Sequence, residues 1–151
     1  MYNIEDIANW FLYNMDDITN KKLQKMVYYA YSWYLTFNNN DSKHIENRFF
    51  VNNFEAWIHG AVDPHLYTKY KKYGSQYIPK YTGMLPNFTY DEIDLLNQIV
   101  IVYGKYTGNE LESICHQEKP WLNARKDCAP GEPSHNKIND CDIFECYASR
   151  L

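Results

Sequence analysis

The longest helical pattern in the chain is TNKKLQKMVYYAYSWYLTF, residues 19–37. Asp16, Asp17 and Thr19 are the candidate N-caps, and apolar side chains then recur around most of the helix circumference. A helix that is apolar on most sides is normally enclosed by other elements, so we expect this one at the centre of the fold. The residues expected to face solvent are Lys21, Lys22, Gln24 and Lys25.

Capping signals predict four further helices, and a last helix is expected from about Asn139. The expected N-caps are Asn3, Asp63, Thr89 and Thr107. Three of these caps are followed, three residues later, by the acidic partner of a capping box. These partners are Asp6, Glu92 and Glu110. The residues expected to end helices are Gly74, Gly104 and Pro120.

The β content is expected to be small. Residues 49–51 are a short β-prone run, whereas residues 54–60 return to helical spacing. Residues 75–88 contain two prolines and a glycine, which predicts an irregular arm with a brief β contact to residues 49–51. The sequence therefore predicts a mainly α fold, a single compact domain over residues 1–151 with about six to seven helices and a minor β element.

Composition and charge narrow the class of protein. Hydrophobic residues make up 45% of the chain and aromatic residues 17%, which suits a packed core and argues against disorder. No apolar run is long enough for a membrane span, and the acidic N-terminus is unlike a signal peptide, so we expect a cytoplasmic protein without a membrane partner. A net charge of −4 disfavours nucleic-acid binding, which depends on Lys and Arg at phosphates, and favours a protein partner.

Signals for catalysis or for a cofactor are weak. P-loop, dinucleotide-binding, nucleophile-elbow and zinc-protease patterns are absent. Zinc-type side chains occur without the close pairing of zinc sites, and free thiols are the preferred interpretation. These side chains are Cys115, His116, Cys128, His135, Cys141 and Cys146. Cys115 and His116 could be a nucleophile and a base, but adjacent helical side chains diverge, and His59 and His65 fit capping or surface positions. We expect no enzyme, no cofactor and no metal.

Four ordered segments resemble one known family. They are Ile18 to Ala30 (ITNKKLQKMVYYA), Phe54 to Pro64 (FEAWIHGAVDP), Tyr103 to Arg125 (which contains LESICH and PW), and Ile138 to Tyr147. Together they resemble the Panacea domain, also called the SocA-like antitoxin or phage-associated-protein domain, over nearly the whole chain. The chain departs from the family pattern at Ala61, where Pro is usual, and at Cys115, where Thr is common.

The resemblance implies a compact, mostly helical antitoxin that neutralises a cognate protein toxin encoded beside it, typically by direct binding. Family members meet toxins of many unrelated classes, so the resemblance does not identify the toxin. Two alternatives remain open. One is a phage or mobile-element protein that binds and blocks a host defence factor, and the other is an adaptor that delivers its partner to a host protease.

Most of the motif residues are expected to have structural roles. They are Leu23, Tyr28, Trp57, Gly60, Val62, Pro64, Pro120 and Trp121. Of these, Leu23, Tyr28, Trp57 and Trp121 are expected in the core, and Gly60 permits a turn. The aromatic stripe within residues 29–37 is also expected to pack in the core and not to stack on bases.

A smaller set of residues is expected to touch a partner. These are Lys25, Tyr77, Tyr81, Phe88 and His116. Lys25 and His116 are polar residues inside apolar patterns, so each is expected to form either a buried hydrogen bond or a partner contact. The three aromatic residues lie in the arm, and aromatic anchors are enriched at interfaces. Lysines at a helix N-terminus are disfavoured, so the cluster at residues 21–25 is a candidate for contact with an acidic partner or an internal carboxylate.

Overall fold

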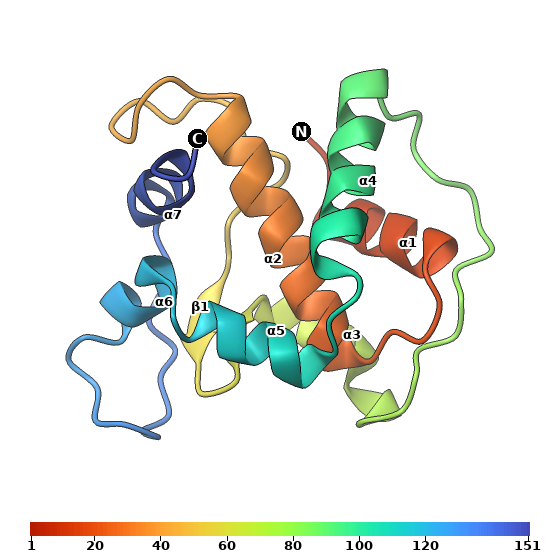
Figure 1. The fold of residues 1–151 in the computed structure, drawn as a ribbon. Helices are drawn as coiled ribbons and strands as arrows, with labels where there is room; N and C mark the ends of the chain where they lie inside the picture. The colour runs from red at the N-terminus through yellow and green to blue at the C-terminus, as the bar shows by residue number, and fades with distance from the viewer.

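In the computed structural model, which describes all 151 residues, helix α2 (Asn20–Phe37) runs through the middle of the molecule (Figure 1). Helix α7 lies on one side of α2, and α1 and α4 lie on the other. The remaining elements are α1 (Ile4–Asn14), β1 (Glu55–Trp57), β2 (Gly60–Val62), α3 (Pro64–Tyr70), the 3-10 helix η1 (Lys71–Tyr73), α4 (Tyr90–Tyr103), α5 (Gly108–Cys115), α6 (Lys119–Ala124) and α7 (Asp140–Ala148). The predicted mainly α fold with a small β element is therefore confirmed.

The central position of α2 follows from its sequence. Every residue from Leu23 to Tyr31 is shielded from solvent, because α1, α4, α5, α7 and β2 all contact this helix. Thr19 accepts a hydrogen bond from the Lys22 amide at 3.2 Å, as expected of its N-cap. Gln24 and Lys25 are buried as well, so the prediction that they face solvent is wrong.

The capping signals place the shorter helices correctly. Thr89 accepts from the Glu92 amide at 3.2 Å, while the Glu92 carboxylate accepts from the Thr89 amide at 2.9 Å. Thr107 and Glu110 form the same reciprocal pair at the start of α5. Asp63 caps α3 by accepting from the Leu66 amide at 2.9 Å. Each of these bonds spans three residues, which is why a local pattern suffices to predict them.

The β element lies elsewhere than predicted. Residues 49–51 form no strand, and residues 54–60 do not form a helix. Instead, β1 and β2 pair in an antiparallel hairpin, with Trp57 opposite Gly60 and two residues in the turn. Gly60 has a φ of +102°, a left-handed conformation that favours glycine, and this ends any helical path through the segment. Phe50, which lies in the run predicted as β, packs instead against Tyr31 of α2, with ring centroids 5.0 Å apart.

Residues 75–88 form the irregular arm that the sequence predicts, but without the β contact to residues 49–51. Two main-chain hydrogen bonds hold the arm against α1 and against the loop that joins α1 to α2. The Ile78 amide donates to the Ile18 carbonyl at 2.8 Å, and the Tyr81 amide donates to the Leu12 carbonyl at 3.2 Å. The arm therefore crosses the loop between α1 and α2 before it enters α4.

A single cluster of 32 buried residues forms the core, and it draws on every helix except α6 and η1. Pro120 was expected to end a helix, yet it occupies the first turn of α6, where its missing amide hydrogen is not needed. Helix α5 ends earlier, at Cys115. None of the helices combines the length and the apolar character needed to cross a membrane.

Candidate functional site

Motif residues from two distant segments tie the β1–β2 hairpin to α5 and α6. Trp121 Nε1 donates to the Trp57 carbonyl oxygen at 2.8 Å, and Arg125 Nη1 donates to the Ala56 carbonyl oxygen at 3.0 Å. His116 stacks on the Trp121 ring with centroids 4.1 Å apart, and the Arg125 guanidinium lies 5.0 Å from the centre of the same ring. The hairpin is therefore held by side chains that bond to its backbone carbonyls.

Trp57 is half-buried and lies outside the buried core cluster, so the prediction that it packs in the core is wrong, whereas the half-buried Trp121 packs against that cluster. Trp57 meets the ring of Tyr67 edge to face, with centroids 5.0 Å apart, on the outer side of the hairpin. The helical spacing assumed for residues 54–60 placed this ring inward, whereas the hairpin leaves it near the surface. Leu23 and Tyr28 are fully buried, as predicted.

Lys25 is the least expected residue of the core. Its side chain is fully buried, and Nζ donates to the Ala61 carbonyl oxygen at 3.1 Å without any carboxylate in ion-pair contact. Burial lowers the pKa of Lys25 to about 8, because the charged form is poorly solvated there. Gly60 leaves room for this side chain, since a Cβ on Gly60 would lie 2.6 Å from Lys25 Cε. Of the two roles expected for Lys25, the structure supplies the buried hydrogen bond.

Cys115 and His116 are poorly suited to nucleophilic catalysis. Burial raises the pKa of the Cys115 thiol to about 12, which keeps it protonated at neutral pH. Burial lowers the pKa of His116, and its Nε2 atom is buried without a hydrogen-bond partner. The His116 ring stacks on Trp121 and remains partly exposed.

Glu118 forms a buried polar centre that the sequence did not reveal. Its Oε1 accepts from the hydroxyl of Tyr29 at 2.7 Å and from that of Tyr147 at 3.0 Å. Its Oε2 accepts from Arg150 Nη2 at 2.6 Å. The donors lie 89, 29 and 32 residues away in the chain, so no local pattern could indicate them.

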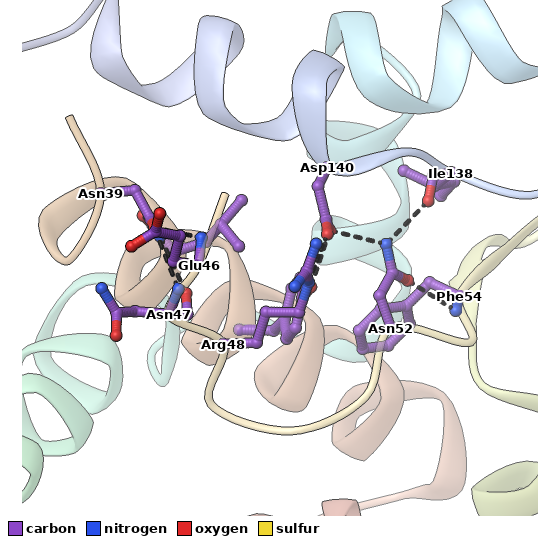
Figure 2. Close-up of polar contacts among 10 residues, drawn as sticks. Asn39, Glu46, Asn47, Arg48, Asn52, Phe54, Ile138 and Asp140 are labelled. Atoms are coloured by element: carbon purple, nitrogen blue, oxygen red, sulfur yellow. Dashed lines mark hydrogen bonds and ion pairs between the residues drawn. The ribbon is translucent and has the colours of Figure 1, made fainter. Parts of the chain in front are cut away.

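A second carboxylate fixes the segment between α2 and β1 (Figure 2). Asp140 Oδ1 accepts from the Tyr31 hydroxyl at 2.7 Å and from Asn52 Nδ2 at 2.9 Å, while Oδ2 accepts from Arg48 Nε at 2.8 Å. In the same segment, Asn39 Oδ1 accepts from two successive backbone amides, at residues 46 and 47. These bonds anchor residues 38–52 to α2 and to the start of α7.

Two grooves of opposite character open on the surface. The first, which we call the lysine groove, has a volume of about 690 Å³ and lies between the first turn of α2, the α3–η1 segment and the turn that joins α4 to α5. Its lining includes Lys21, Lys22, Lys25, Lys71 and Lys105, but only one carboxylate, Asp17. This groove therefore carries a concentrated positive charge on a protein whose net charge is −4.

The second groove, which we call the α2–α4 groove, has a volume of about 720 Å³. Its apolar lining comes from the C-terminal half of α2, from α4 and from the C-terminal residue, whose position beside the end of α2 is visible in Figure 1. These apolar residues are Trp33, Tyr34, Phe37, Leu95, Ile99, Val102, Tyr103 and Leu151. Asp91, Glu92 and Asp94 are the charged side chains of the lining, so this groove is apolar and acidic.

The residues predicted to touch a partner do not form one surface. Lys25 and Tyr77 line the lysine groove, and Tyr77 is well exposed. Tyr81 is half-buried and donates to the Met84 carbonyl at 3.0 Å within the arm. Phe88 is only 8% exposed and packs on Tyr2 with centroids 4.7 Å apart, so the expectation that it faces a partner is corrected. The α2–α4 groove was missed because residues 29–37 were expected to lie entirely in the core.

The zinc-type side chains are not brought together. No group of three or more His, Cys, Asp or Glu side chains has an arrangement that could hold a metal ion. His59 Nδ1 contacts Glu112 at 3.0 Å, and His65 contacts Glu5, both at the surface. All four cysteines are free thiols.

The comparison with protein families identifies the chain. The model of the SocA-like antitoxin, Panacea domain, matches residues 23–122, from the first turns of α2 to within α6. The match includes Lys25, the hairpin and the stacked His116–Trp121 pair. No curated protein and no solved structure matches the chain. Because the matched segment is well over half of the 151 residues, the chain belongs to the SocA-like antitoxin family, which is defined by the Panacea domain.

Proposed function

We propose that this protein is an antitoxin that binds a protein toxin directly and holds it inactive, without catalysing a reaction. Membership of the SocA-like family supports a toxin as the partner. The observation that carries the proposal to a particular surface is the α2–α4 groove, where exposed apolar side chains stand beside acidic ones. The proposal places both proteins in the cytoplasm.

The apolar part of the α2–α4 groove has the properties of a docking surface. Phe37 is 58% exposed and Val102 is 49% exposed, although both lie on helices that pack into the core. Between them, Trp33 Nε1 donates to the Tyr103 hydroxyl at 2.8 Å, which fixes two large rings in place. Exposed apolar side chains beside rigid aromatic rings are the features that anchor partner side chains at protein interfaces.

The charge of the α2–α4 groove indicates the chemistry of the segment that it would accept. Asp91 and Asp94 form no ion pair, and no lysine or arginine lines the groove. Glu92 is already engaged, because it accepts from the Tyr2 hydroxyl at 2.6 Å. We therefore expect the toxin to present an apolar segment flanked by lysine or arginine, since complementary charges guide association and favour the correct partner.

Co-expression with the product of the adjacent reading frame tests this proposal. The double variant Phe37→Asp and Val102→Asp places two charges in the groove without altering buried positions. We expect this variant to lose growth rescue and copurification with the toxin, while its circular dichroism spectrum stays that of the wild type. The matched control is Met84→Asp, because Met84 is an apolar residue of the arm that is 92% exposed and lies outside the groove.

The outcomes of this experiment test the binding surface, the antitoxin function and the mode of neutralisation separately. A groove variant that still neutralises the toxin would show that the toxin binds elsewhere. A wild-type protein that neither rescues growth nor copurifies with any toxic neighbour would contradict the antitoxin function. Immunoblotting of the toxin separates masking from delivery to a protease, because masking leaves the amount of toxin unchanged.

A further inference from the structure

The lysine groove concentrates positive charge that the protein does not neutralise. Lys21 pairs with Glu112 at 2.9 Å, and Lys22 donates to the Gly104 carbonyl oxygen at 2.7 Å, where α4 ends. Lys25, Lys71 and Lys105 form no ion pair, although all three line the groove. Five of the 15 basic residues in the chain are thus gathered here, against one of its 19 acidic residues.

The start of α2 and the start of α5 meet at this groove. A Cβ on Gly108, the first residue of α5, would lie 3.1 Å from the backbone nitrogen of Lys22 in the first turn of α2. Each helix start carries a partial positive charge, although Thr19 and Thr107 already cap one amide of each first turn, and helix starts are common binding sites for phosphate. Two adjoining helix starts repel each other, and a bound anion would relieve this repulsion.

Lys25 adds a buried positive charge to the wall of the groove. It is fully buried in the wall of the groove, and the Ala61 carbonyl is its one hydrogen-bond acceptor. An ammonium group can donate three hydrogen bonds, and a buried charge is normally paired. The missing counter-charge would be supplied by an anion that lies in the groove.

The remaining lining residues are suited to contact a planar ring of a ligand, in addition to its negative charge. Trp57, Tyr67, Tyr77 and Tyr106 contribute aromatic surface to the same groove. Trp57 and Tyr67 pack edge to face, and the Tyr106 ring lies 5.3 Å from Lys105 Nζ. A volume of about 690 Å³ lies within the range of small-molecule sites.

We propose that the lysine groove binds a small ligand that carries several phosphate groups and a planar ring, the chemistry of a nucleoside diphosphate or triphosphate. Lys71 of η1 and Lys105 of the α4–α5 turn contact the phosphates together with the helix starts of α2 and α5. Lys25 provides the field of a buried positive charge beneath them, and the aromatic side chains contact the ring. This site is separate from the α2–α4 groove and does not depend on the identity of the toxin.

Isothermal titration of the purified full-length chain tests the site without any toxin. The probes are ATP, inorganic tripolyphosphate and adenosine, in magnesium-free buffer at two salt concentrations. We expect ATP to bind more tightly than tripolyphosphate and adenosine not to bind, with weaker binding of ATP at higher salt. Undetectable binding of ATP at millimolar concentration would overturn the proposal, and equal affinities for ATP and tripolyphosphate would overturn the contact with the ring.

Substitutions locate the ligand. The double variant Lys71→Glu and Lys105→Glu reverses two exposed charges and is expected to weaken ATP binding by at least about tenfold. Lys25→Met removes the buried charge at similar size and is also expected to weaken binding, with an unchanged circular dichroism spectrum. The control is Lys43→Glu, an exposed lysine outside the groove. Unchanged affinity in the double variant would overturn the site, and unchanged affinity in Lys25→Met would remove Lys25 from it.

Discussion

Gly60 lies directly against the side chain of Lys25, so that a Cβ on Gly60 would be 2.6 Å from Lys25 Cε. The same glycine has a φ of +102° at the turn of the hairpin. Gly60→Ala therefore meets both backbone strain and a steric clash, and we expect it to lower the free energy of unfolding by about 2 to 4 kcal/mol. Urea denaturation of the purified protein measures this change.

Gly131→Ala separates the backbone strain of a positive φ from the steric clash with Lys25. Gly131 also has a positive φ, of +75°, but a Cβ there would meet no atom within 4 Å. We expect it to lower the free energy of unfolding by only about 1 kcal/mol. Equal losses in the two variants would show that the contact with Lys25 is unimportant, whereas a smaller loss for Gly60→Ala in a Lys25→Ala background would support it.

Burial of Lys25 predicts a pH-dependent stability. The pKa of this lysine is lowered by burial to about 8 in the folded protein, against about 10.4 for an unperturbed lysine. Between these values the unfolded chain binds the extra proton, so this group makes the protein more stable as the pH rises from 8 towards 10. Below pH 8 both states are protonated, and the folded state bears the full cost of the buried charge.

A comparison with Lys25→Met isolates this effect, because Cys115 opposes it. Burial raises the pKa of Cys115 to about 12, so the thiol ionises first in the unfolded chain. The contribution of Cys115 to the free energy of unfolding therefore decreases as the pH rises. We expect the stability of the wild type to improve relative to Lys25→Met by about 1 to 2 kcal/mol between pH 7.5 and 9.5. Denaturation curves at the two pH values measure the difference. A constant difference would mean that Lys25 titrates normally.

The Trp121 indole connects α6 to the hairpin through one hydrogen bond and one ring stack. Because Trp121 is half-buried, we expect Trp121→Ala to cost about 2 to 3 kcal/mol, less than a fully buried tryptophan. Trp121→Phe retains a ring against His116 but removes the donor to the Trp57 carbonyl, so its expected loss is about 1 kcal/mol. Thermal melts of both variants test the order, and a melting temperature of Trp121→Ala equal to that of the wild type would contradict the contact.

The sequence predicts helix starts well and the hairpin poorly, for one physical reason. The capping bonds of Thr89 and Thr107 join residues three apart, so they are visible in a short window of sequence. The hairpin depends on distant partners, since the Ala56 amide donates to the Asn136 carbonyl at 2.8 Å. Apolar residues within 54–58 fit a helix equally well by spacing, and tertiary pairing decides between the two structures.

The candidate surfaces were also hard to predict from the sequence, because their residues come from distant segments of the chain. Lys25 was recognisable as a polar residue in an apolar helix, yet its acceptor, Ala61, lies 36 residues away. The lysine groove gathers Lys71 and Lys105 from separate turns, and no sequence pattern links them to α2. Phe37, the last residue of α2, is exposed, although the apolar pattern of α2 alone predicts burial.

Glu118 provides the sharpest test of how the core is held together. Its carboxylate receives hydrogen bonds from Tyr29, Tyr147 and Arg150, and it therefore links α2 and α7 to the segment before α6. Glu118→Gln preserves the size of the side chain but removes the charge that strengthens these bonds, so we expect it to lower the free energy of unfolding by about 2 to 4 kcal/mol. Glu46→Gln, at an exposed position, removes the same charge and is expected to cost less than about 0.5 kcal/mol. Urea denaturation measures both losses. Equal losses in free energy of unfolding would contradict this role of Glu118, because its hydrogen bonds would then stabilise the fold no more than hydrogen bonds to water.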